Sequence, residues 1–240
     1  MKTVVIIPAL NEEASIAGVV TAIPRASVSE VLVIDNRSID NTASVARAAG
    51  ATVVYEPVRG YGTACLRGLL ALPEAVECVV FLDADLADRP EELPRLIAPI
   101  ASDEADLVIG SRTLGERERG ALTPQAFFGN KLACWLIRLL WRHRYTDLGP
   151  FRALRTSTLR RLRLCDRDFG WTVEMQVRAL QEGLRVTEVA VPYRRRVGKS
   201  KISGTVSGTV RAGYKILTTI GLLYWRYKRG RRTPRTPERK

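Results

Sequence analysis

The chain has 240 residues, of which 46% are hydrophobic and 26% charged, and its formal net charge is +13. This length and balance predict a folded protein with a full α/β core and exclude a disordered chain. A single histidine, His143, and four widely spaced cysteines without a Cys-x-x-Cys pair argue against a zinc site, a serine-type triad and a disulfide framework. We expect buried, reduced thiols at Cys65, Cys78, Cys134 and Cys165.

The positive charge is concentrated in two segments. Residues 226–240 carry a net charge of +7 and residues 192–201 a net charge of +5, so the remainder is almost neutral. Two short basic segments on a neutral body fit an anionic substrate or an anionic membrane surface better than nucleic acid.

The N-terminus leads directly into an apolar strand at Val4, and no apolar run approaches the ~20 residues that span a bilayer. We therefore expect a cytoplasmic protein, associated peripherally with the cytoplasmic face of the membrane.

Strand and helix patterns alternate through the first half. Strands are predicted at 3–8, 31–35, 52–56, 79–83 and 105–110, and helices at 12–22, 38–49, 60–72 and 90–100. This alternation predicts βαβ units, right-handed crossovers and a mostly parallel sheet.

Two carboxylates end the fourth predicted strand, in Phe81-Leu82-Asp83-Ala84-Asp85. Because residues i and i+2 of an extended segment point the same way, Asp83 and Asp85 can share one hard cation, Mg²⁺ or Mn²⁺, at the ligand crevice. Alternatively, Asp85 and Asp88 cap the helix that begins near Pro90.

The first two strands also end in polar residues. Strand one leads into Pro8-Ala9-Leu10-Asn11-Glu12, and strand two ends at Asp35 before Ser38 and Asp40. Helix capping explains Ser38 and Asp40, whereas a carboxylate at the end of a strand can accept hydrogen bonds from a base or ribose.

The pattern changes after Gly110. Residues 127–141 and 212–225 form two apolar helical segments, suited either to the core or to a membrane interface, and the second leads into a basic end. We divide the chain into a catalytic domain (1–203), an interfacial helix (204–228) and a flexible basic tail (229–240).

Two acids and a basic loop in the second half are further candidates. Asp147 lies in Asp147-Leu148-Gly149-Pro150-Phe151-Arg152, and Glu174 follows Phe169-Gly170-Trp171, where an ion pair with Arg178 is the structural alternative. The segment 193–202 ends in Gly198-Lys199-Ser200-Lys201 and is suited to grip phosphate.

Together, these pieces resemble the family 2 glycosyltransferases of GT-A fold, and among them the enzymes similar to dolichyl-phosphate mannose synthase. The matching segments are Pro8 to Glu12, Asp35 to Thr42, Asp83 to Asp85, Asp147 to Arg152 and Arg194 to Lys201. The resemblance departs at Arg37, where the family often has glycine, and at Ala87, where mannose synthases place a third metal-binding side chain.

The resemblance implies a metal-dependent, inverting transfer of a hexose from a GDP-mannose or UDP-glucose type of donor to a polyprenyl phosphate. It implies that Asp83 and Asp85 hold the metal and that the nucleotide sugar contacts Pro8, Ala9, Asn11, Glu12, Asp35, Asp83 and Ala84. It also implies phosphate or acceptor contacts from Arg152, Arg194, Arg196, Lys199, Ser200 and Lys201.

Three alternatives remain at this point. With a hydroxyl acceptor, the catalytic residues would include Asp147 or Glu174 in addition to Asp85, because such an acceptor would need one of them as general base. An ionised lipid phosphate needs no general base. A sugar-nucleotide nucleotidyltransferase usually has a basic glycine-rich loop after strand one, unlike Leu10-Asn11-Glu12-Glu13. A non-catalytic basic module would not need an acidic crevice.

Overall fold

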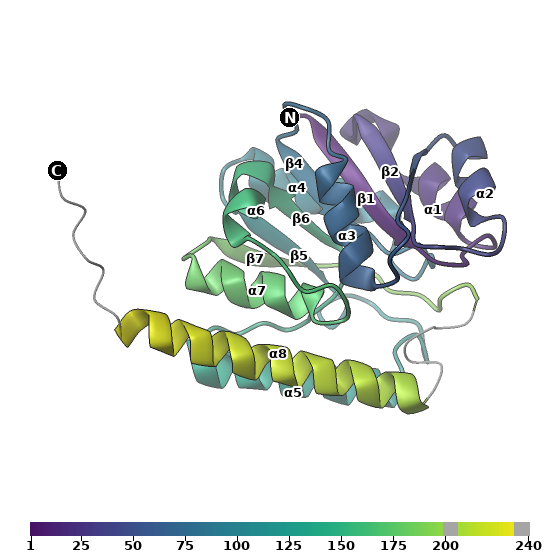
Figure 1. Cartoon of the computed structure of the whole chain (residues 1–240). Helices are drawn as coiled ribbons and strands as arrows, with labels where there is room; N and C mark the ends of the chain where they lie inside the picture. The colour runs from purple at the N-terminus through teal and green to yellow at the C-terminus, as the bar shows by residue number, and fades with distance from the viewer. Residues whose placement is uncertain (199–205, 233–240) are drawn as a thin grey trace.

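A seven-stranded β-sheet forms the centre of the computed structural model, which describes residues 1–198 and 206–232, with side chains for 1–198 and 211–229. The strands lie in the order β3-β2-β1-β4-β6-β5-β7, and all neighbours are parallel except those of β6. Their bounds are β1 Thr3–Ala9, β2 Glu30–Asp35, β3 Thr52–Tyr55, β4 Cys78–Phe81, β5 Leu107–Ser111, β6 Arg152–Arg155 and β7 Val186–Ala190. The predicted α/β class and mostly parallel sheet are confirmed (Figure 1).

Helices cover both faces of this sheet. One face packs against α1 (Ile16–Ala22), α2 (Thr42–Ala48) and α4 (Leu93–Ala101), which follows a 3₁₀ turn at Pro90–Glu92. The other face packs against α3 (Tyr61–Leu70), α6 (Thr156–Leu162) and α7 (Trp171–Gln181). A second 3₁₀ turn lies at Arg25–Ser27.

The sequence of β1 shows why the central strands are apolar throughout. Val4 and Ile6 face the core beneath α3 and α7, while Val5 and Ile7 face the core beneath α1 and α4. All four side chains are fully buried, so polar residues are excluded until the strand ends. The site residues therefore gather at the carboxyl edge of the sheet.

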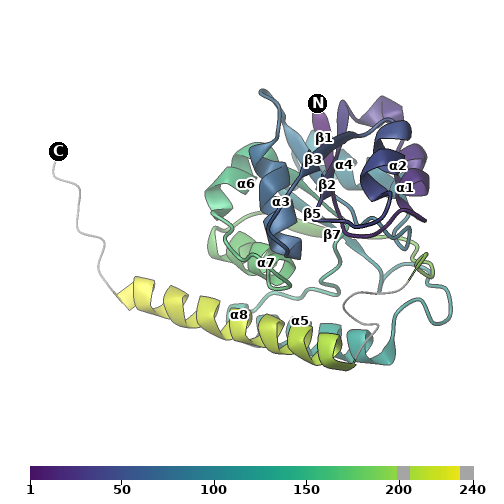
Figure 2. The same ribbon diagram turned by 45° about the vertical axis from the view of Figure 1, so that its right-hand side comes forward.

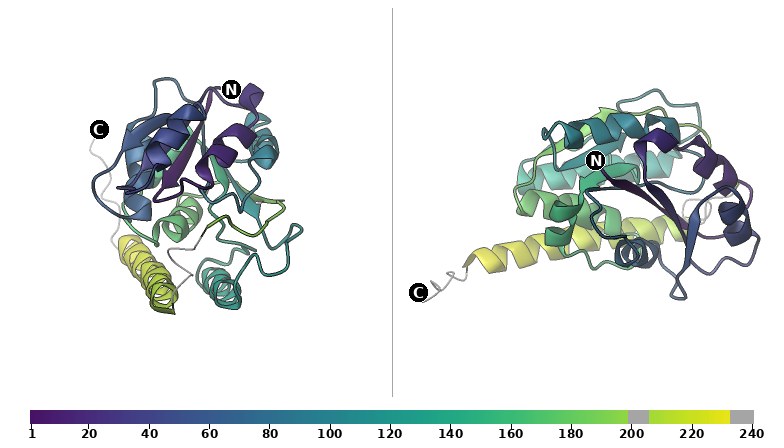
Figure 3. Two further views of the ribbon diagram at one scale, coloured as in Figure 1. Left: turned by 90° about the vertical axis from the view of Figure 1, so that its right-hand side faces the viewer. Right: turned by 90° about the horizontal axis from the view of Figure 1, so that it is seen from above.

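Two long helices, α5 (Pro124–Trp141) and α8 (Val206–Arg232), lie side by side along the lower edge of the molecule (Figures 1 and 2). Viewed end-on, they form a pair next to α7 (Figure 3). Ile220 and Leu223 of α8 are buried, and Trp141 meets Tyr224 edge to face at 5.5 Å between ring centroids. Among the described residues, no helix combines the length and the apolar character that a bilayer span requires.

The structure adds elements that the sequence did not predict. β6, α6 and β7 were missed, and α8 extends beyond 212–225 in both directions, into the segment 229–240. Cys65, Cys78 and Cys134 are buried as expected, but Cys165 is exposed.

Candidate active site

A cavity of about 710 Å³ opens at the carboxyl ends of β1, β2 and β4. Many of the predicted site residues line it: Pro8, Ala9, Asn11, Glu12, Asp83, Ala84, Asp85 and Arg196. The sequence patterns at the ends of β1 and β4 therefore identified one wall of a real cavity.

The loop after β1 is held against the loop after β2. Asn11 has a left-handed backbone (φ +52°), its N–H donates to Ser38 Oγ at 2.9 Å, and its Oδ1 accepts the N–H of Ile39 at 2.8 Å. The N–H of Glu12 donates to Thr42 Oγ1 at 2.7 Å. These bonds join the two loops into one rim for the cavity.

Asp35 helps to hold the loop after β2 in place. Its side chain is buried, accepts the N–H of Ser38 at 3.1 Å and is not among the residues that line the cavity. Arg37 has φ +63°, a backbone conformation that glycine adopts without strain, which is consistent with the glycine that the resemblance led us to expect there.

Asn36 was not predicted, although it follows β2 directly and lines the cavity. Its Oδ1 accepts the N–H of Gly60 at 2.9 Å and its Nδ2 donates to Val58 O at 2.7 Å, so it holds the loop that precedes α3. Tyr61, the first residue of α3, donates its hydroxyl to Asp83 Oδ1 at 3.0 Å.

Asp83 lies close enough to Asp85 for the charge of Asp85 to affect the protonation of Asp83. Burial, followed by the charge of Asp85, raises the pKa of Asp83 to about 7. Asp83 is partly buried, whereas Asp85 is buried and its Oδ1 accepts the N–H of Ala87 at 2.9 Å. Two neighbouring carboxylates that repel each other are stabilised by a cation between them.

Arg196 supplies positive charge beside this pair. Its Nη2 lies 2.8 Å from Asp85 Oδ2 and 3.9 Å from Glu12 Oε1. The backbone places it there: the N–H of Val197 donates to Asp85 O and that of Arg194 to Ala87 O. The segment 194–197 therefore runs alongside the two acids.

The donor set fits a hard divalent cation. Both groups are carboxylates at the edge of an open cavity, which leaves room for water and for phosphate oxygens as further ligands. Across the described part of the chain, no three His, Cys, Asp or Glu side chains are grouped as a metal site. Asp88 is buried, and neither of its carboxylate oxygens has a hydrogen-bond partner among the residues that the structure describes. Burial raises its pKa.

The expected phosphate contact of Arg152 is corrected by the structure. Its side chain is fully buried and donates to the carbonyls of Leu148, Gly149 and Thr172. Burial lowers its pKa. Arg152 therefore ties β6 to the preceding loop and to α7, and it does not line the cavity.

Asp147 and Glu174 are also corrected as general bases. Asp147 is fully buried and forms a two-point ion pair with Arg112, at 2.8 Å to Nε and 2.7 Å to Nη2. Glu174 is buried, pairs with Arg178 at 2.8 Å and accepts the N–H groups of Cys165 and Asp166. Neither carboxylate lines the cavity.

Only part of the predicted basic loop 193–202 lies within the residues that the structure describes. Arg194 donates through Nε to the carbonyl of Leu86 and does not line the cavity, unlike Arg196. Lys199, Ser200 and Lys201 lie outside the described residues.

The remaining part of the cavity lining was missed. Its residues come from the loop before α3, the first residue of α3, the loop before α7 and the first turns of α8: Arg59, Gly60, Tyr61, Arg167, Asp168, Phe169 and Arg211. The repeated arginines and the Gly60-Tyr61-Gly62 turn were the available signals, but only folding brings these distant segments together.

Comparison with known proteins agrees with this geometry. The family model of Glycosyl transferase family 2 matches residues 4–162. An uncharacterized glycosyltransferase of Mycobacterium tuberculosis is 40% identical over 208 residues, covering 86% of this chain and 92% of the relative. An undecaprenyl-phosphate mannosyltransferase of Micrococcus luteus is 33% identical (87% and 90% covered), and a dolichyl-phosphate hexose transferase of Haloferax volcanii is 30% identical (85% and 88%).

A solved structure extends the comparison to the fold. Glucosyl-3-phosphoglycerate synthase from Mycobacterium tuberculosis, in complex with Mn²⁺, UDP-glucose and phosphoglyceric acid, superposes with a TM-score of 0.74 at 25% identity, covering 93% of this chain and 80% of that one. The expected GT-A architecture is confirmed. The chain belongs to glycosyl transferase family 2 and is a glycosyltransferase.

Proposed function

We propose that this glycosyltransferase moves a hexose from a nucleoside-diphosphate sugar to a polyprenyl phosphate at a membrane surface, with Mg²⁺ or Mn²⁺ held by Asp83 and Asp85. The observation that carries the proposal is the composition of the cavity. Four arginines line it, while both carboxylates predicted as general bases are buried in ion pairs elsewhere. Such a site suits an acceptor that is already anionic.

The relatives support the same acceptor class. Two of them are named for transfer to undecaprenyl phosphate and dolichyl phosphate, and each covers at least 85% of this chain. The glucosyl-3-phosphoglycerate synthase instead has a small soluble acceptor, phosphoglyceric acid, in its structure.

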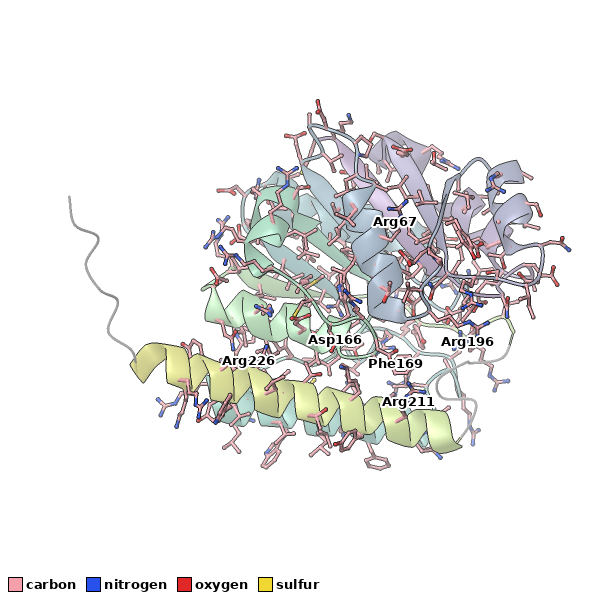
Figure 4. All side chains as sticks on the ribbon, in the orientation of Figure 1. Arg67, Asp166, Phe169, Arg196, Arg211 and Arg226 are labelled. Atoms are coloured by element: carbon pink, nitrogen blue, oxygen red, sulfur yellow. The ribbon has the colours of Figure 1, made fainter. Side chains whose placement is uncertain are left out.

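The exposed side of α5 and α8 supports a membrane location. We call it the α5–α8 apolar face; it consists of Phe128, Leu132, Trp135, Leu139, Tyr214, Leu217, Leu222 and Trp225. In Figure 4, side chains project from this pair of helices away from the sheet. Exposed basic residues accompany the apolar ones, including Lys131, Arg226 and Arg229. This combination is typical of a helix pair that rests on an anionic bilayer.

The chemistry is a single displacement at the anomeric carbon. An ionised oxygen of the lipid phosphate attacks this carbon, the bond to the leaving nucleoside diphosphate breaks, and the configuration inverts. No proton has to be removed from the acceptor, so no general base is required. A bound divalent cation would supply positive charge to the leaving diphosphate. Arg196, next to Asp85, is placed to add a hydrogen-bonding cation there.

The test is an assay of nucleotide release. Purified protein is incubated with Mn²⁺ or Mg²⁺, a panel of UDP- and GDP-sugars, and farnesyl phosphate, farnesol or 3-phosphoglycerate as acceptor. We expect release and a glycosylated lipid with farnesyl phosphate alone, and loss of turnover in Asp85→Asn without loss of fold by circular dichroism. Equal turnover with farnesol, or turnover only with 3-phosphoglycerate, would contradict the proposal.

A further inference from the structure

We infer that Arg167 and Arg211 bind the phosphate of the acceptor, forming a subsite separate from the one that holds the donor's diphosphate. This inference rests on the proposed function and names the residues that recognise its acceptor. The two arginines come from different elements, the loop before α7 and helix α8, and both line the cavity. Neither was predicted from the sequence.

The loop that carries Arg167 is fixed by close packing on α3. The carbonyl of Arg167 accepts the N–H of Thr63 at 3.0 Å and its hydroxyl at 3.1 Å. A Cβ on Gly60 or Gly62 would lie 2.2 Å from a backbone oxygen of this loop, so only glycine permits this approach. The backbone position of Arg167 at the cavity is therefore fixed by the fold.

The same loop is fastened to α8. Asp166 Oδ2 lies 2.8 Å from Lys215 Nζ, and the side chain of Asp166 is almost buried in this contact. A Cβ on Gly170 would lie 2.6 Å from Thr219 Oγ1. Figure 4 shows Asp166, Phe169 and Arg211 along this border between loop and helix. The contacts bring Arg211 to the mouth of the cavity.

Both guanidinium groups retain the capacity to bind an anion. Arg211 Nη2 is 4.0 Å from Asp168 Oδ2, the outer limit of an ion pair, and its side chain is 77% exposed. Arg167 is exposed, and within the described residues its guanidinium makes no hydrogen bond or ion pair. A phosphate can displace Asp168 and receive charge-assisted hydrogen bonds from both groups.

The surroundings of Arg211 favour an acceptor that carries a hydrocarbon chain. Tyr214 lies one helical turn further along α8 and is 70% exposed, and it begins the part of the α5–α8 apolar face that continues to Leu217 and Trp225. Arg196, by contrast, is engaged with Asp85, where the donor's diphosphate is proposed to bind. A phosphate at Arg167 and Arg211 would thus have its prenyl chain over an apolar surface.

Calorimetric titration with farnesyl phosphate tests this subsite without requiring turnover. We expect Arg211→Ala and Arg167→Ala each to weaken binding of farnesyl phosphate about tenfold to a hundredfold, with Arg211→Lys in between. Binding of UDP or GDP with Mn²⁺ should stay within about twofold of the wild type. Arg67→Ala, an exposed arginine on α3 that does not line the cavity, is the matched control and should bind both ligands normally.

The outcomes separate this inference from the proposed function. If the wild type transfers sugar to farnesyl phosphate but Arg167→Ala and Arg211→Ala leave its KM and binding unchanged, the subsite is wrong and the function stands. If the wild type binds farnesyl phosphate through these arginines but transfers no sugar to it, the function is wrong and the subsite stands. A selective loss of nucleotide affinity in both variants would assign the arginines to the donor and overturn the inference.

Discussion

At the scale of single residues, Asp83 is a carboxylate whose ionised form destabilises the folded protein. The burial and neighbouring charge that raise its pKa from 3.8 to about 7 favour the protonated form in the folded state. Ionised Asp83 therefore lowers the free energy of unfolding, with the full effect above about pH 7 and progressively less toward pH 4. Such a loss of stability is expected at a site that is proposed to bind a cation, because the free carboxylates repel each other until the cation is bound.

We expect Asp83→Asn to raise the Tm of the metal-free protein at pH 8 by several degrees, with a smaller gain at pH 5, and to abolish Mn²⁺ binding. The amide oxygen can still accept the hydroxyl of Tyr61, so the local structure is retained. Asp106→Asn is the control of opposite sign, because hydrogen bonds from Arg185 lower the pKa of Asp106 and its loss should reduce Tm at pH 8. Scanning calorimetry at the two pH values measures both effects. A lower Tm for Asp83→Asn at pH 8 would contradict the argument.

Arg152 illustrates a charged side chain that serves the fold. Its guanidinium satisfies three main-chain carbonyls in the interior, so Arg152→Ala leaves a cavity and unpaired acceptors. We expect the free energy of unfolding to fall by about 2–5 kcal/mol, measured by urea denaturation. The folded fraction should keep wild-type affinity for nucleotide and Mn²⁺. Wild-type stability combined with weaker nucleotide binding would restore the phosphate-binding role that the sequence led us to expect.

At the scale of elements, the basic segment 193–197 lies beside the acidic residues that follow β4. Its backbone pairing with residues 85–88 brings Arg196 to Asp85, so the guanidinium would compete with a metal ion held by this carboxylate, as proposed. We expect Arg196→Ala to bind Mn²⁺ alone several-fold more tightly, yet to bind the nucleotide sugar with Mn²⁺ more weakly.

Arg195→Ala is the matched control for this segment. The side chain of Arg195 donates to the carbonyl of Arg119 rather than to Asp85, and its backbone N–H donates to the carboxylate of Glu118. Removal of this side chain should therefore change neither the affinity for Mn²⁺ nor that for the nucleotide sugar. Isothermal titration with Mn²⁺, in the presence and absence of nucleotide sugar, distinguishes the two variants. Equal Mn²⁺ affinity in Arg196→Ala and the wild type would show that the ion pair does not compete with the metal.

The strands show how far sequence patterns reach. β1, β2 and β4 were predicted because continuous apolar runs end in polar residues, and the same reasoning identified one wall of the cavity. β6 was missed because it is short and has an arginine at each end, and burial of Arg152 depends on carbonyls that only the folded chain supplies. β7 is a half-buried edge strand with a weak alternating pattern. Arg167 and Arg211 were missed because they are far apart in the sequence and line the same cavity only after α8 packs beside α7.

At the scale of the whole molecule, the cavity adjoins the α5–α8 apolar face, which is proposed to contact the membrane. Arg211 lines the cavity, and the exposed residues that follow it on α8 belong to the apolar face. On α5, Trp135 and Leu139 extend this face, and on α8 the guanidinium of Arg229 lies 3.6 Å from the ring centroid of Trp225. An aromatic ring paired with a cation fits the interface between headgroups and acyl chains.

We therefore expect Trp135→Glu combined with Trp225→Glu to reduce sedimentation with anionic vesicles at least about tenfold, because two exposed aromatic contacts are lost and negative charge is introduced. Leu70→Glu, an 80% exposed residue on α3, is the control for a charged substitution outside this face. Turnover of farnesyl phosphate in detergent-free buffer should be unchanged in the double variant, whereas turnover of a long polyprenyl phosphate embedded in vesicles should fall in parallel with binding. Equal vesicle binding by the double variant and the wild type would exclude this face as the membrane contact, and equal losses in the double variant and Leu70→Glu would reduce the effect to net charge alone.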